Sequence, residues 1–237
     1  MSCRICGGME IKVGLDRSLD AYKVKETDKD ELINNIIDAE WTMFDEVENI
    51  DGRADCQDDG RTFYIMRYSG HSCLTEITLS SYYEDIQEAV SAGRNLIAEK
   101  YAYMMKVTDP EYFRTELESE LPLIMESKQR LVDEIVGIIV SSEKRFVSQY
   151  PYFSRASRPA ENDIDGIISV KIYAEGEYKT YSEKTLKLCL EDLKSMLINE
   201  GIGPSFAVHD RMVRFYGYKG MEDAEEHMKN AVVGTKY

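Results

Sequence analysis

The chain has 237 residues, 43% of them hydrophobic, which is enough to bury a sizeable core in one large domain or two small ones. Its 29 Lys and Arg against 44 Asp and Glu give a formal net charge of −15, which repels nucleic-acid phosphates and anionic lipid headgroups. Because no apolar run approaches the ~20 residues that span a bilayer and no signal peptide is visible, we expect a cytoplasmic protein without nucleic-acid or membrane partners.

The first segment, residues 1–27, is predicted to be a flexible N-terminal extension. It contains Cys3 and Cys6, whose spacing allows two thiolates to hold one zinc ion. A closed zinc site needs four ligands, and no second pair of this spacing follows, so Cys3 and Cys6 are weak metal-ligand candidates. The odd total of five cysteines also argues against a secreted disulfide framework.

The first helix is predicted over residues 28–49. Apolar side chains recur along it at helical spacing, at Ile33, Ile36, Ile37, Phe44 and Val47. A polar stretch follows to Gly60, and then a short apolar segment around Phe63. A further helix is predicted from about residue 72 to Ala92, with Gly93 as its C-terminal cap.

The pattern continues with a helix through residues 96–105. Asp109 and Pro110 then have the residue types of an N-cap and a first helical residue, and they predict a connecting helix that reaches toward Glu126. The second half predicts helices over about 126–149, 182–200 and 204–216, and a last one from about 219. Residues 167–173 have strand-like composition and are interpreted as a short extended piece or a helix start. The predicted fold class is all-α.

The two halves of the chain are similar. Residues 75–79 and 84–86 match residues 182–186 and 191–193 at a constant offset of 107, and other segments match at offsets of 102 and 108. This similarity predicts a helical bundle of two degenerate repeats of about 100 residues, 28–125 and 126–237, within one compact domain.

Charged residues lie on apolar helix faces in the first half only. Glu40 is on the same stripe as Ile33 and Phe44, and its counterpart at offset 102 is Ser142. A carboxylate in an apolar seam needs a partner, and we expect Lys100, which follows Leu96 on the fourth helix and corresponds to Val208. These charges are either a structural ion-pair network or part of a ligand or catalytic pocket, and any pocket is predicted in the first half.

The loop after the first helix concentrates polar groups between Gly52 and Asp59. The adjacent Asp58 and Asp59 could ligate a divalent cation, or one could act as a general base. The catalytic candidates are therefore Glu40, Asp58, Asp59 and Lys100. The binding candidates are Arg53, Gln57, Arg67, Arg94, Asn95, Glu99 and Tyr101.

Three stretches carry a resemblance to a known family. They are residues 40–44, residues 52–67 and residues 93–101, and there the chain resembles a bacterial family known as domain of unknown function 4125. The resemblance covers most of the chain from about residue 30 and implies no reaction. This chain departs from the family pattern at residues 69–74 and again at residues 201–204, which predicts altered substrate contacts.

These features favour a small-molecule enzyme that uses acid–base chemistry, lyase- or hydrolase-like, on an anionic metabolite. The chain has no common nucleotide-binding or hydrolase motif, so no cofactor is evident apart from a candidate divalent metal. Two alternatives stay open: a non-catalytic helical module that binds a ligand or a protein, and a carboxylate-ligated metal site. The sequence leaves the oligomeric state undetermined.

Overall fold

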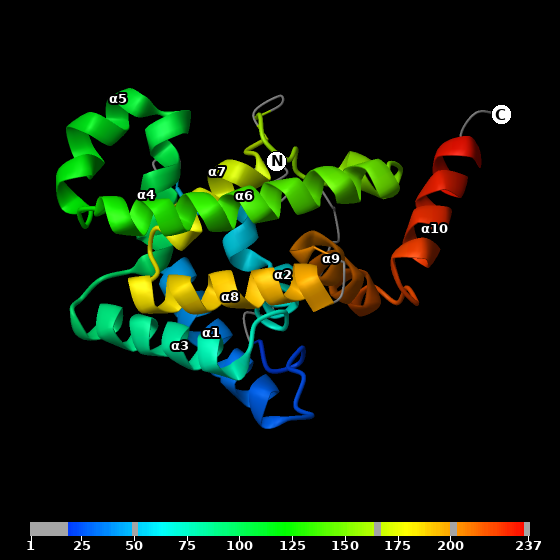
Figure 1. The fold of residues 1–237 in the computed structure, drawn as a ribbon, viewed down its shortest axis with the longest axis horizontal. Helices are drawn as coiled ribbons and strands as arrows, with labels where there is room; N and C mark the ends of the chain where they lie inside the picture. Colours follow the sequence, from blue (N-terminus) through cyan, green and yellow to red (C-terminus); the bar gives the residue numbers. More distant parts are fainter. Residues whose placement is uncertain (1–18, 49–51, 164–166, 200–202, 235–237) are drawn as a thin grey trace.

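A computed structural model describes residues 19–48, 52–163, 167–199 and 203–234. Within them the chain forms ten α-helices and no β-strand, which confirms the predicted all-α class (Figure 1). The helices α6 and α8 run across the molecule, α3 lies below α8, and α10 lies at one edge (Figure 1).

The first two helices form where local signals place them. Helix α1 spans Asp28–Asp45 and begins with a capping box, in which the Thr27 hydroxyl accepts from the Asp30 N–H and the Asp30 carboxylate accepts from the Thr27 N–H. Helix α2 spans Gly60–His71 and is capped by Asp59, so the short segment expected around Phe63 is a full helix.

Helix α3 spans Glu76–Ser91 and helix α4 spans Leu96–Thr108. Gly93 has φ of 70° in the turn between them, which confirms the predicted glycine cap. The predicted connecting helix exists only in part: α5 covers Pro110–Tyr112, followed by a π-turn over Phe113–Leu117 and a 3₁₀ turn over Glu118–Glu120. The chain then runs without helix to residue 125.

The second half begins with the long helix α6, Glu126–Gln149, followed by a 3₁₀ turn at Phe153–Ala156. The ambiguous stretch 167–173 is a helix start, since Ser169 caps α7, Val170–Tyr178. The remaining helices are α8 (Glu183–Asn199), α9 (Pro204–Phe215) and α10 (Met221–Gly234), close to their predicted limits.

The two halves pack around one another. In the first half α1 contacts α2, α3 and α4, and in the second half α6 contacts α7, α8 and α9. Between the halves, α3 packs on α8, α4 packs on α7 and α2 packs on α9. The main hydrophobic core therefore contains residues of both, among them Ile33, Ile36, Val132 and Leu186. The duplication stays a prediction.

Two hydrogen bonds between α3 and α8 are reciprocal. The Thr75 N–H donates to the Asp192 carboxylate at 2.8 Å, and the Ser182 N–H donates to the Asp85 carboxylate at 2.9 Å. Each aspartate therefore binds the backbone at the start of the other half's third helix.

Residues 19–27, the last part of the predicted N-terminal extension, make buried contacts with the helices. Leu19 is buried in the main core, and the Val24 N–H donates to the Tyr64 hydroxyl at 2.8 Å. Asn34 in turn donates to the Val24 carbonyl at 2.7 Å. This segment therefore packs on α1 and α2, where its backbone groups form hydrogen bonds. Cys3 and Cys6 lie outside the described residues.

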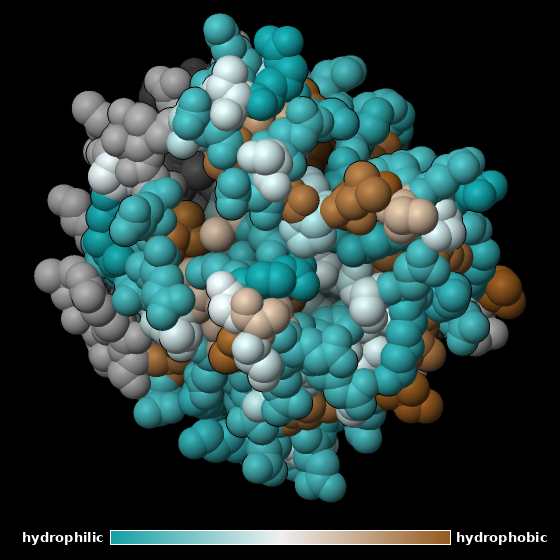
Figure 2. Space-filling view, turned by 90° about the vertical axis from the view of Figure 1, so that its left-hand side faces the viewer, coloured by the Kyte–Doolittle hydropathy of each residue, from teal (hydrophilic) through white to brown (hydrophobic). Residues whose placement is uncertain are grey.

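The face in Figure 2 is predominantly hydrophilic, with hydrophobic residues in small separate patches. Among the described residues, no helix is long and apolar enough to cross a bilayer.

Candidate functional site

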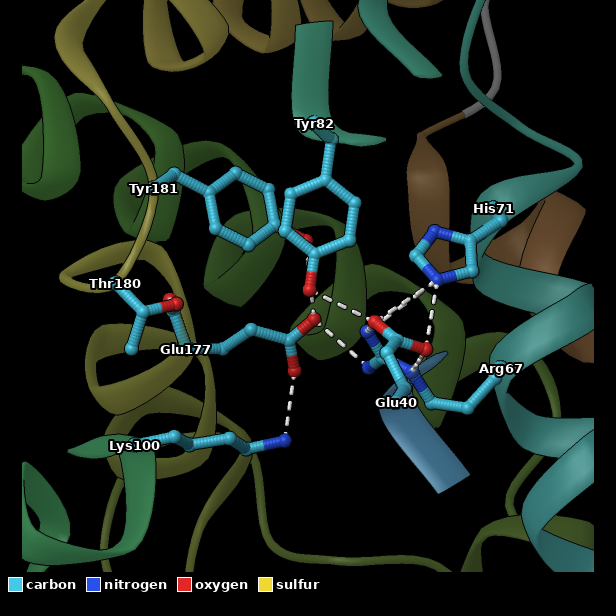
Figure 3. A network of polar contacts seen from close by, with 8 residues as sticks. All are labelled: Glu40, Arg67, His71, Tyr82, Lys100, Glu177, Thr180 and Tyr181. Carbon is cyan, nitrogen blue, oxygen red and sulfur yellow. Dashed lines mark hydrogen bonds and ion pairs between the residues drawn. The ribbon is translucent and has the colours of Figure 1, made fainter. Parts of the chain in front are cut away.

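The candidate site is centred on Glu40, whose side chain is completely buried on the core-facing stripe of α1. Arg67 from α2 holds this carboxylate with two nitrogens: its Nε donates at 2.8 Å and its Nη2 donates to the second oxygen. The Tyr82 hydroxyl from α3 donates at 2.8 Å (Figure 3). The buried charge that the sequence predicts therefore has a full set of donors.

His71 completes the surroundings of Glu40. It follows Arg67 by one helical turn on α2, and its Nε2 lies 3.2 Å and 3.3 Å from the two carboxylate oxygens. The contact with Glu40 is a hydrogen bond when Nε2 carries the ring hydrogen, and Arg67 Nη2 also lies 3.4 Å from Nε2. Glu40 and His71 thus form a buried carboxylate–imidazole pair.

Glu177 brings a second carboxylate to the same place, from α7 of the second half. Arg67 Nη1 donates to one of its oxygens at 2.8 Å, and Lys100 Nζ donates to the other at 2.8 Å. The Tyr181 hydroxyl donates to Glu177 at 3.3 Å. Arg67 therefore bridges two carboxylates, and Lys100 closes the far end of the cluster (Figure 3).

We call Glu40, Arg67, His71, Tyr82, Lys100, Glu177 and Tyr181 the charged cluster. Two aromatic rings flank its lysine: Lys100 Nζ lies 3.5 Å from the ring centroid of Tyr173 and 5.9 Å from that of Tyr101. Rings at this distance stabilise an ammonium group by cation–π attraction.

The protonation states follow from burial and from these neighbours. Burial would raise the pKa of Glu40, but the positive charge of Arg67 and the contact with His71 outweigh it and hold that pKa well below its usual value. For Glu177, burial is likewise outweighed by Arg67 and Lys100, which lower its pKa to about 2. Burial and the Glu40 charge raise the pKa of Tyr82 well above its ordinary value. At neutral pH the cluster thus holds two carboxylates and a neutral phenol.

The cluster is closed at both ends and slightly more exposed in the middle. The side chains of Glu40, His71 and Lys100 are 0%, 4% and 4% exposed, whereas those of Arg67 and Glu177 are 12% and 16% exposed. Solvent therefore reaches the cluster beside Arg67 and Glu177.

Three of the predicted residues, Glu40, Arg67 and Lys100, meet in this cluster. The expected direct pair between Glu40 and Lys100 is wrong, because Glu40 pairs with Arg67 and Lys100 pairs with Glu177. The predicted restriction to the first half is also wrong for the cluster, since Glu177 and Tyr181 belong to the second half.

The polar loop after α1 has structural contacts instead. Gln57, only 1% exposed, donates to the carbonyls of Phe44 and Val47 at 2.8 and 3.0 Å and so satisfies the C-terminal end of α1. Arg53 pairs with Asp45 and Asp58 at the surface.

Four other candidates lie at helix starts. Asp59 accepts from the Thr62 N–H at 3.0 Å and caps α2, and Asn95 accepts from the Ala98 N–H at 2.9 Å and caps α4. Arg94 makes a bidentate pair with Glu99, with both hydrogen bonds at 2.7 Å. The contacts described for these residues connect them to helix ends and to each other, not to the charged cluster.

Sequence reasoning missed His71, Tyr82, Glu177 and Tyr181. A helix assignment for α2 would have placed His71 one turn from Arg67 on the same face. Tyr82 lies on the apolar stripe of α3 between Leu79 and Ile86, where a buried hydroxyl needs a partner.

Among the described residues, no group of three or more His, Cys, Asp or Glu side chains is placed to hold a metal ion. Cys56 and Cys189 are buried, and Cys73 is partly buried. A shallow hollow of about 470 Å³ lies along α3 and is lined by Glu84, Gln87, Glu88, Ser91 and Ala92. None of these residues belongs to the charged cluster.

The fold and the site together define an all-α protein whose two halves meet around a buried, paired set of acids and bases. Residues 30–226 match the family described as protein of unknown function (DUF4125). Because this match covers most of the chain, the protein belongs to that family. No curated protein and no solved structure matches the chain.

Proposed function

We propose that the protein is a small-molecule enzyme that performs acid–base chemistry, of the lyase or hydrolase kind, on an anionic metabolite at the charged cluster. The observation that carries this proposal is the buried pair of Glu40 and His71, with the carboxylate oxygens 3.2 and 3.3 Å from Nε2. Carboxylate–imidazole pairs of this kind orient a histidine for proton transfer in many enzymes.

The roles follow from the charges. Glu40 stays ionised, holds the Nε2 hydrogen of His71 and fixes the tautomer in which Nδ1 accepts a proton from the substrate. Tyr82 stays protonated, and its hydrogen bond to Glu40 helps to keep that carboxylate ionised and in place beside His71. Arg67 and Lys100 supply the positive charge that an anionic substrate needs.

A non-catalytic binding module is the second candidate. It is favoured by the fact that Glu40, Arg67, Lys100 and Glu177 all have partners within the protein. Buried ion pairs of this kind can exist for structural reasons alone.

His71→Gln separates these functions, because glutamine keeps a hydrogen-bond donor toward Glu40 and cannot transfer protons. A matched control is His209→Gln, since His209 also faces a carboxylate, Glu143, at 3.5 Å but in the second half. Metabolites that raise the melting temperature of the wild-type protein are tested for turnover.

We expect His71→Gln to bind such a metabolite but to convert it about 10² to 10⁴ times more slowly, and His209→Gln to convert it normally. Equal turnover by His71→Gln and wild-type protein would refute the assignment of His71. Binding without turnover by the wild-type protein would favour the binding module.

We also infer that the chain consists of two related units. The reciprocal bonds of Asp85 and Asp192 support this inference, because both the donors and the acceptors are related by the offset of 107 that the sequence predicts. The pairing of α2 with α9 and of α4 with α7 supports it as well, because exchanging the units exchanges the two pairs.

A further inference from the structure

We propose that Arg67, Lys100 and Tyr181 form a receptor for a substrate carboxylate, and that Glu177 occupies this receptor as an internal competitor. The substrate class is then a small molecule with a singly charged carboxylate group. This inference rests on the proposed function insofar as it calls the ligand a substrate.

The receptor is complete for a carboxylate. Arg67 Nη1 and Lys100 Nζ donate to different oxygens of Glu177, each at 2.8 Å, and Tyr181 adds a third donor at 3.3 Å. A guanidinium and an ammonium on the two oxygens of one carboxylate give charge-assisted hydrogen bonds, the stronger kind. An incoming carboxylate would find the same donors in place.

Glu177 is the carboxylate that can leave. Its side chain is 16% exposed and lies in the last turn of the nine-residue helix α7. Glu40 is 0% exposed and lies within the 18-residue helix α1. A change of side-chain rotamer can turn Glu177 toward solvent, whereas Glu40 has no solvent to turn to.

Helix α7 itself is held against α4. A Cβ on Gly176 would come within 2.7 Å of Met104 Cγ and 2.8 Å of the Lys100 carbonyl oxygen, so the two helices cross closely at this glycine. Because α7 is held against α4 beside Lys100, we expect the exchange of carboxylates to occur by rotation of the Glu177 side chain and not by movement of α7.

The charges favour a carboxylate over a phosphate. The two acids Glu40 and Glu177 balance the charges of the two bases Arg67 and Lys100. A singly charged ligand in place of Glu177 keeps this balance. A doubly charged phosphate would leave one negative charge uncompensated in a mostly buried site, which is costly.

The test uses Glu177→Gln in the full chain, because glutamine has a similar shape and no negative charge to compete for the two cations. Calorimetric titration at pH 7 with acetate and with inorganic phosphate, at constant ionic strength, measures the dissociation constants. The matched control is Glu175→Gln, two residues earlier on α7, where the carboxylate pairs with Lys179.

We expect Glu177→Gln to bind acetate about tenfold more tightly than the wild-type protein, a difference of about 1.4 kcal/mol. Glu175→Gln should bind acetate like the wild-type protein, Glu177→Gln/Lys100→Met should lose the gain, and phosphate should bind each variant more weakly than acetate. Unchanged acetate binding by Glu177→Gln, or tighter binding of phosphate, would overturn the proposal.

A second measurement does not depend on the variant's stability. A crystal structure of the wild-type protein with acetate should show acetate between Arg67 and Lys100 with the Glu177 side chain turned away, and Glu177 still in place would overturn the proposal. Acetate binding between Arg67 and Lys100, without turnover of any metabolite, would support the carboxylate receptor and refute the proposed enzymatic function. Turnover of a metabolite that binds while Glu177 stays in place would support the enzyme and refute the carboxylate receptor.

Discussion

Replacing Glu40 with glutamine should lower the free energy of unfolding by about 3 kcal/mol at pH 7. The carboxylate is 0% exposed and accepts hydrogen bonds from Arg67 and Tyr82, with His71 beside it. Breaking a buried ion pair by removing one partner costs about 3 to 5 kcal/mol. We expect the lower end of this range because Arg67 keeps its second carboxylate, Glu177.

Urea denaturation followed by circular dichroism measures this loss. In a domain of this size, about 3 kcal/mol corresponds to a fall of about 6 to 12 °C in melting temperature. Glu31→Gln is the control, since Glu31 is exposed on the same helix and should change stability by less than ~0.5 kcal/mol. If Glu40→Gln differed from this control by less than ~1 kcal/mol, the cluster would not contribute to stability as argued.

The depressed pKa of Glu177, about 2, means that its contribution to stability is present above the unfolded carboxyl pKa, about 4.3, and is lost as the pH falls toward 2. Urea denaturation should therefore show a loss of stability between about pH 4.5 and pH 2, and a smaller loss in Glu40→Gln, which lacks the second depressed carboxyl. Gly176→Ala should destabilise the protein by about 1 to 3 kcal/mol because of the close contact with α4, whereas Gly137→Ala, in open space on α6, should stabilise it by about 0.5 to 1 kcal/mol. Asp192→Ala should lower the free energy of unfolding by about 2 kcal/mol, because Asp192 accepts hydrogen bonds from Thr75 and Thr78. Asp85→Ala should lower it by about 1 kcal/mol, because Asp85 accepts from the Ser182 N–H. Thermal denaturation measures both losses, and equal losses would contradict this ranking.

Most helices could be predicted because their signals are local. The apolar stripe of α1 and the glycine after α3 fix those elements within a few residues of sequence. The same stripe predicted that Glu40 is buried, since a position on the core face stays on it whatever the side chain. The full length of helix α2 was harder to predict, because its buried positions are occupied largely by tyrosines and a histidine and do not form a simple apolar stripe.

The partners of the buried charges could not be predicted in the same way. Glu177 meets Arg67 across 110 residues of sequence, and their contact depends on how α7 crosses the first half. Polarity alone also does not separate chemistry from capping. Gln57, Asp59 and Asn95 form hydrogen bonds with backbone groups at helix ends, which every helix requires. In the sequence, a polar residue with this capping role looks the same as a polar residue in a catalytic site.

The two-unit organisation that we infer pairs Glu40 with Ser142, and the structure around Ser142 explains why the second half has no carboxylate at that position. Ser142, the counterpart of Glu40, accepts from the Ser205 N–H at 3.1 Å at the start of α9. A Cβ on Gly203 would lie 2.1 Å from the Ser142 hydroxyl, so the backbone before α9 comes too close for a longer side chain at position 142. In the first half, Glu40 has room to extend to Arg67. The second half contributes Glu177 from α7 and Tyr181 from the turn after it. On the two-unit organisation that we infer, the chain can therefore have a single asymmetric site, because the close approach of Gly203 to Ser142 leaves no room for a carboxylate at position 142.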